Sequence, residues 1–111
     1  MLFVSESADP NSPSGLELLR SPSEAINEYE YWFAERSHFI CDLGGQCYIF
    51  RSRKFNHLDI EKTDMMVDFS VVKSLACRLT SHDPDFTERI RGAKTEHELR
   101  DVLADYLEKW G

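Results

Sequence analysis

Cysteine is scarce in this chain and occurs in an odd number. The three cysteines, Cys41, Cys47 and Cys77, do not suffice for the disulfide framework of a small secreted protein. No Cys-x-x-Cys occurs, and none of the four histidines stands at a zinc-site spacing from another His or a Cys. We therefore expect reduced thiols, no bound metal and no cofactor.

Long apolar runs and an excess of positive charge are also missing. No basic segment followed by an apolar stretch opens the chain, and no apolar run approaches the roughly 18 residues of a membrane span. The net charge is −7, from 13 basic and 20 acidic side chains. Because a nucleic-acid backbone or an anionic membrane requires a positive surface, we expect neither as a partner. We expect a cytoplasmic protein whose acidic surface suits a basic protein partner.

The motifs of common catalytic sites are absent as well. The sequence has no Gly-x-Ser-x-Gly nucleophile motif and no glycine-rich loop before a helix that would cradle a phosphate. Cys41 and His38, considered as a thiol and its base, would point to opposite faces of a strand. A buried structural role explains Cys41 better. We assign no catalytic residue, although scattered acids with His57 or His82 leave a small acid–base enzyme as an alternative.

The chain does contain enough apolar material for one hydrophobic core. Its 111 residues are 41% hydrophobic and include seven Phe, four Tyr and two Trp. This predicts a single domain over residues 1–111, with a loop at residues 5–15, which are rich in Ser, Pro and Asp. We predict an α+β fold in which a small antiparallel sheet packs against three or four helices. Residues 1–4, as an edge strand, and residues 58–60 would add to the sheet.

The strongest local signal is a β-hairpin over residues 38–51. Two runs of strand-forming residues flank Gly44-Gly45, and consecutive glycines tolerate the positive φ angles of a two-residue turn. That turn pairs Cys41 with Tyr48 and places Cys41 and Cys47 on opposite faces. A three-residue loop would instead set the two cysteines opposite each other, so their spacing tests the register. With the two-residue turn, the more apolar face holds Phe39, Cys41, Leu43, Tyr48 and Phe50.

Helix-start and helix-stop signals divide the rest of the chain. A Ser-Pro-Ser-Glu start predicts a helix over residues 21–36. Its apolar stripe consists of Ala25, Ile26, Tyr29, Trp32 and Phe33. Residues 64–81 fit a strand or a helix at their beginning and favour a helix from Ser70 onward. Asp83-Pro84 and Gly92 bound a short helix, and a second capping box at Thr95 opens the final helix.

The helix over residues 21–36 also carries the candidate binding site. Residues 1–37 contain seven acids and two bases, a local charge of −5. On a helix Tyr31 lies about 200° from Tyr29 and Phe33, which predicts a partly exposed ring among carboxylates; the alternative is that the ring packs on another element or lies along the rim of the core. Such a surface suits a cationic partner, because aromatic side chains anchor a contact and charge steers it. We predict partner contacts at Glu24, Asn27, Glu28, Tyr31 and Glu35. A competing interpretation is that the basic cluster at residues 51–54 neutralises these acids.

These features favour a small acidic, non-enzymatic protein-binding domain. An immunity or inhibitor protein that neutralises a basic partner such as a toxin has this size and charge. The first alternative is a self-associating structural or regulatory domain, forming a homodimer, because the hairpin face with Ile40 and Ile49 needs a cover or a partner. The second alternative is the small acid–base enzyme.

Overall fold

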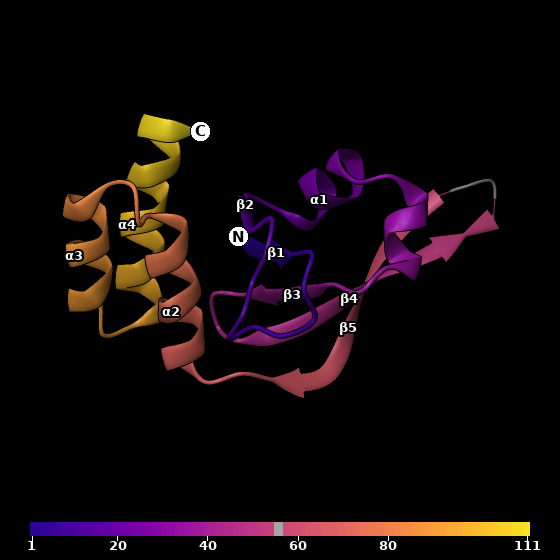
Figure 1. The fold of residues 1–111 in the computed structure, drawn as a ribbon, viewed down its shortest axis with the longest axis horizontal. Coiled ribbons are helices and arrows are strands. Elements are labelled where there is room, and N and C mark those ends of the chain that lie inside the picture. The colour runs from indigo at the N-terminus through magenta and orange to yellow at the C-terminus, as the bar shows by residue number, and fades with distance from the viewer. Residues whose placement is uncertain (55–56) are drawn as a thin grey trace.

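A five-stranded antiparallel sheet is flanked by two groups of helices, one beside the end of the sheet and the other above it in Figure 1. The computed structural model describes residues 1–54 and 57–111. The strands are β1 (Leu2–Ser5), β2 (Glu17–Leu19), β3 (Phe39–Asp42), β4 (Gln46–Arg53) and β5 (His57–Met66), in the spatial order β2-β1-β3-β4-β5. The helices are α1 (Pro22–Glu28), the 3₁₀ helix η1 (Tyr31–Glu35), α2 (Phe69–Leu79), α3 (Pro84–Gly92) and α4 (Glu96–Trp110). The predicted α+β class is confirmed.

Each face of the sheet has its own hydrophobic core. Strand side chains alternate between the two faces, so Phe3 joins one core while Leu2 and Val4 join the other. The first core packs the sheet against α2, α3 and α4, and the second packs it against α1 and η1. Ile40, whose face was expected to need a partner, is fully buried in this second core. The cover for Ile40 is therefore provided within the chain, whereas Ile49 lies on the other face in the observed register and is only partly buried.

The hairpin between β3 and β4 forms, but its predicted register is wrong. Cys41 pairs with Cys47, so the loop has three residues rather than two. The carboxylate of Asp42 accepts hydrogen bonds from the amides of Gly44 (3.0 Å) and Gln46 (2.9 Å), which stabilises the longer loop. Gly45 takes the left-handed conformation, with φ +89°, that this loop type requires.

The register determines which side chains share a face. Cys47 lies with Cys41 in the core on the α2–α4 side. Tyr48 and Phe50, predicted to accompany Cys41, lie with Ile40 on the α1–η1 side. Both thiols are free and buried.

The predicted helix over residues 21–36 is two shorter elements. Ser21 caps α1 as expected, with its hydroxyl accepting from the amide of Glu24 (3.2 Å). The helix ends at Glu28, Tyr29 is extended (φ −112°, ψ 143°), and η1 then begins at Tyr31. No basic residue offsets the dipole in the last turn of α1, and aromatic side chains have only modest helix propensity. The helix ends where the Tyr29 side chain packs toward the sheet.

The other predicted elements form close to their expected limits. Helix α2 begins at Phe69, α3 runs from Pro84 to Gly92, and the Thr95 hydroxyl caps α4 by accepting from the amide of Glu98 (3.1 Å). Strand β5 is longer than expected and forms one edge of the sheet. Strand β1 was predicted at an edge, but it lies between β2 and β3.

Candidate partner-binding surface

Element η1 is anchored to the sheet by an aromatic cluster. The Phe33 side chain is only 5% exposed, and its ring lies 4.6 Å from the Tyr29 ring and 5.7 Å from the Phe50 ring, centroid to centroid. The Tyr29 hydroxyl donates to a Glu17 carboxylate oxygen at 3.2 Å. Burial, together with the charge of Glu17, raises the pKa of Tyr29, so its hydroxyl remains a donor at neutral pH.

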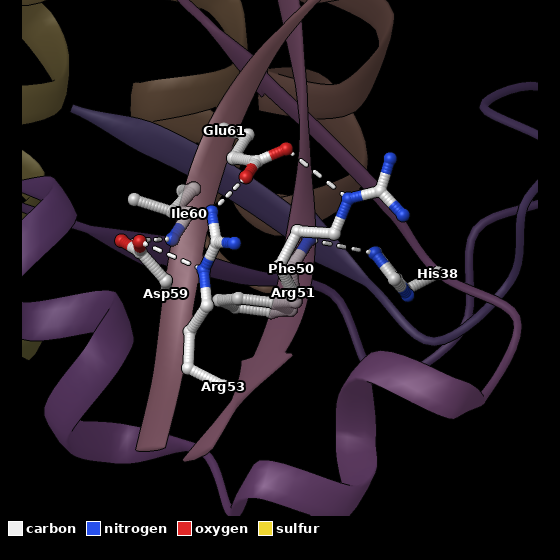
Figure 2. A network of polar contacts seen from close by, with 7 residues as sticks. All are labelled: His38, Phe50, Arg51, Arg53, Asp59, Ile60 and Glu61. Atoms are coloured by element: carbon white, nitrogen blue, oxygen red, sulfur yellow. Dashed lines mark hydrogen bonds and ion pairs between the residues drawn. The ribbon is translucent and has the colours of Figure 1, made fainter.

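His38 adds a polar link between η1 and the sheet (Figure 2). Its Nδ1 lies 2.8 Å from the carbonyl oxygen of Arg36, and its Nε2 lies 3.1 Å from the amide nitrogen of Phe50. Since an amide only donates and a carbonyl only accepts, the ring carries its proton on Nδ1 and accepts at Nε2. The end of η1 is thereby held at a fixed position against β4.

This anchoring leaves two large aromatic side chains facing solvent. Tyr31 is 39% exposed and Trp32 is 43% exposed. The guanidinium carbon of Arg36 lies 4.6 Å from the centroid of the Trp32 ring, a cation–π arrangement that orders both side chains. We call Tyr31, Trp32, Glu35 and Arg36 the η1 surface.

A shallow hollow of about 320 Å³ adjoins the η1 surface. Glu6, Phe33, Arg36 and Ser37 line it. Its wall combines the buried Phe33 ring with a cationic and an anionic side chain.

Two acidic side chains of the α1–η1 segment form no ion pair with the described residues. Glu28 and Glu35 are exposed, and the ion pairs found among residues 1–54 and 57–111 include neither. The interpretation that the basic cluster at residues 51–54 neutralises them is wrong for its two arginines. Arg51 pairs with Glu61 and Arg53 with both Glu61 and Asp59 on the outer face of the β4–β5 hairpin (Figure 2).

The five predicted contact residues are divided between two elements. Their spacing would give one face only on a continuous helix, and the break at Tyr29 separates Glu24, Asn27 and Glu28 from Tyr31 and Glu35. Glu24 also has a structural role, because its carboxylate accepts from the Arg20 amide at 2.8 Å. Asn27, Glu28, Tyr31 and Glu35 are exposed. The contacts themselves remain a prediction.

Sequence reasoning missed two residues of the η1 surface. Trp32 was assigned to the buried stripe of a helix that does not continue, and Arg36 was read only as the helix end. A signal for both was present, since an Arg four residues after a Trp stacks on the ring if the segment is helical.

The thiol and histidine pairs considered for chemistry are engaged elsewhere. Burial, with the nearby Cys47 and Asp42, raises the pKa of Cys41 to about 12, so the thiol is protonated at neutral pH. Cys41 lies in the core on the α2–α4 side, whereas the His38 ring lies against Phe50 on the other face.

The two helix-end residues His82 and Asp83 also have structural partners. His82 Nε2 lies 2.7 Å from the hydroxyl of Tyr106. A carboxylate oxygen of Asp83 accepts from Lys109 Nζ (2.9 Å) and Trp110 Nε1 (3.1 Å). The bond from Lys109, assisted by that from Trp110, lowers the pKa of Asp83. These contacts fasten the end of α4 to the start of α3.

Within the described part of the chain, no group of three or more His, Cys, Asp or Glu side chains is arranged to hold a metal ion. Across residues 1–54 and 57–111, no helix combines the length and the apolar content needed to cross a bilayer. Comparison with protein-family models, curated proteins and solved structures found no match.

Proposed function

We propose that this protein is a non-enzymatic protein-binding domain that contacts a basic partner through the η1 surface. Within this class, we propose an immunity or inhibitor protein that neutralises a basic partner such as a toxin. The observation that carries the proposal is the exposure of Tyr31 and Trp32 together with Arg36 on a rigidly anchored segment. Trp, Tyr and Arg are the residues that most often dominate the binding energy of protein interfaces.

Charge supports a basic partner over a neutral one. The chain carries a net charge of −7, residues 1–37 alone carry −5, and exposed Glu35 lies on η1 with Tyr31 and Trp32. Complementary charge mainly accelerates association and excludes wrong partners, while the aromatic anchors provide affinity. The two contributions therefore predict different effects of charge and aromatic substitutions.

Affinity capture from the source cells, with quantitative mass spectrometry, tests the proposal. The Trp32→Ala variant should capture much less of a specific basic partner than the wild-type protein does. The Met65→Ala variant should capture as much of it as the wild-type protein. Met65 is a suitable control because it is 65% exposed and lies on β5, outside the η1 surface. Equal recovery of every captured protein with both variants would count against the η1 surface.

A charge pair completes the design. Glu35→Lys should slow association with the captured partner and make it less sensitive to salt. Glu108→Lys, which makes the same change in net charge on an exposed position of α4, is the matched control. If both variants slow association equally, net charge rather than the η1 surface steers binding.

A self-associating domain is the second candidate, and one observation favours it. Strand β5 lies at the edge of the sheet over ten residues, and Met65 and Met66 at its end are exposed. The edge also carries features that oppose pairing, since Asp59 accepts a hydrogen bond from the amide of Ile60 at 2.9 Å and charged residues line the strand. Sedimentation at high protein concentration tests self-association through β5, because a strict monomer excludes this candidate.

A further inference from the structure

A groove lies in the other group of helices, between α2 and α3. Its volume is about 450 Å³. Helix α2 and the residues after it line one wall with Ser74, Cys77, Arg78 and Ser81, and α3 lines the other with Pro84, Thr87, Glu88 and Arg91. Both walls follow the same i, i+3, i+4, i+7 spacing, so each follows one side of its helix, with Ser81 just beyond the end of α2. The two helices pack side by side in Figure 1.

The groove is locally basic in an acidic protein. Its lining has two guanidinium groups, Arg78 and Arg91, against the single carboxylate of Glu88. Glu88 lies 3.7 Å from Arg91, and both side chains are largely exposed, so this pair is weak. Arg78 has one long contact, at 3.4 Å, to the carbonyl oxygen of Asn11. Both guanidinium groups therefore keep donors available for a ligand.

Hydroxyl groups and a neighbouring hollow extend the groove. The side chains of Ser74 and Ser81 are exposed, whereas the Thr87 hydroxyl donates to the Thr80 carbonyl oxygen at 2.9 Å. A second hollow, of about 470 Å³, shares Arg78 and Ser81 with the groove. Arg78 thus stands where the two concave regions meet and is accessible from either.

We propose that this groove binds a small organic molecule through a phosphate group held by Arg78 and Arg91. A planar guanidinium donates two parallel hydrogen bonds to phosphate oxygens, and serine hydroxyls supply further donors. The volume lies within the range of small-molecule sites, about 300–1,000 Å³. Two arginines in a chain of net charge −7 are too few for a nucleic-acid backbone, so the ligand is a small phosphate ester.

Cys77 provides a built-in reporter for the test. It lines the groove and is partly exposed, whereas Cys41 and Cys47 are buried. Alkylation of the native protein by N-ethylmaleimide, which is uncharged, therefore reports access to the groove. Phenyl phosphate is the probe, and benzoate is the arm that distinguishes a phosphate from a carboxylate.

Phenyl phosphate should slow the alkylation of Cys77 with saturation, and benzoate should do so only at much higher concentration. Arg78→Gln and Arg91→Gln should each raise the half-protecting concentration about tenfold, since each removes a charge-assisted bond. Arg20→Gln, an exposed arginine outside the groove, should leave it unchanged. Linear protection without saturation, equal protection by benzoate, or an equal effect of all three substitutions would each overturn the proposal.

Discussion

Two adjacent glycines in the β3–β4 loop should differ sharply in their tolerance of alanine. Gly45 has φ +89°, and a Cβ there would collide with the carbonyl oxygen of Val67. Gly44 has no positive φ, and a Cβ there would first meet the flexible side chain of Glu96 at 3.2 Å. Only Gly45 is therefore required to be glycine.

The expected magnitudes follow from these contacts. A left-handed conformation costs a non-glycine residue about 1–2 kcal/mol. Displacing the backbone also weakens the hydrogen bond from the Val67 amide to the Gly45 carbonyl oxygen (2.9 Å), which costs about another 0.5–1.5 kcal/mol. We expect Gly45→Ala to lower the free energy of unfolding by about 2–3 kcal/mol, and Gly44→Ala to change it by less than about 1 kcal/mol.

Urea denaturation of both variants measures this difference directly. A two-residue type I′ turn needs positive φ at both glycines, so it predicts similar losses for the two variants. Equal destabilisation would therefore refute the three-residue loop and the pairing of Cys41 with Cys47. A loss of about 2–3 kcal/mol leaves a domain of ordinary stability folded, so both variants remain measurable.

Three other perturbations have defined outcomes. In the native protein one thiol, Cys77, should react with a maleimide, because Cys41 and Cys47 are buried and burial raises the pKa of Cys41 to about 12. After unfolding, mass spectrometry should find all three thiols modified. Replacing His38 with Ala should cost about 1–3 kcal/mol in urea denaturation, since a strand amide loses its acceptor, whereas His97→Ala, on an exposed side chain, should cost less than about 0.5 kcal/mol. Because the folded-state pKa of Asp83 is lowered, its contribution to stability is present at neutral pH and is lost as the pH falls below about 4. Asp83→Asn should therefore reduce the loss of unfolding free energy between neutral pH and about pH 3. An unchanged loss would contradict a stabilising role for the ionised Asp83.

The starts of α1 and α4 and both limits of α3 were predictable because their signals are local. The hydroxyls of Ser21 and Thr95 each cap an amide only three residues away, so the sequence alone contains both partners. Pro84 and Gly92 likewise act on the backbone at their own positions. None of these interactions depends on how distant elements pack.

The hairpin register could not be decided from the glycines alone. Gly44-Gly45 is compatible with a two-residue turn and with a three-residue loop. Cys47 lies on one face of the sheet with the first and on the opposite face with the second. The deciding group is the carboxylate of Asp42, which accepts from the amides of Gly44 in the loop and Gln46 at the start of β4. An Asp immediately before a Gly-rich loop is therefore the signal that reasoning from backbone propensity overlooked.

The break between α1 and η1 has a tertiary cause that periodicity cannot reveal. Tyr29 packs on Phe50, a strand residue 21 positions later, with ring centroids 5.3 Å apart. That contact and the hydrogen bond to Glu17 hold Tyr29 in an extended rather than a helical conformation. The same break rotates Trp32 out of the expected core, and thus creates the surface that carries the proposed function.

The affinity of the purified partner for wild-type protein and for Trp32→Ala tests the central claim most directly. If Trp32 is an interface anchor, the substitution should raise Kd by about 30-fold, which corresponds to about 2 kcal/mol, while Met65→Ala leaves Kd unchanged. A Kd that is the same for all three proteins would mean that the η1 surface is not where the partner binds.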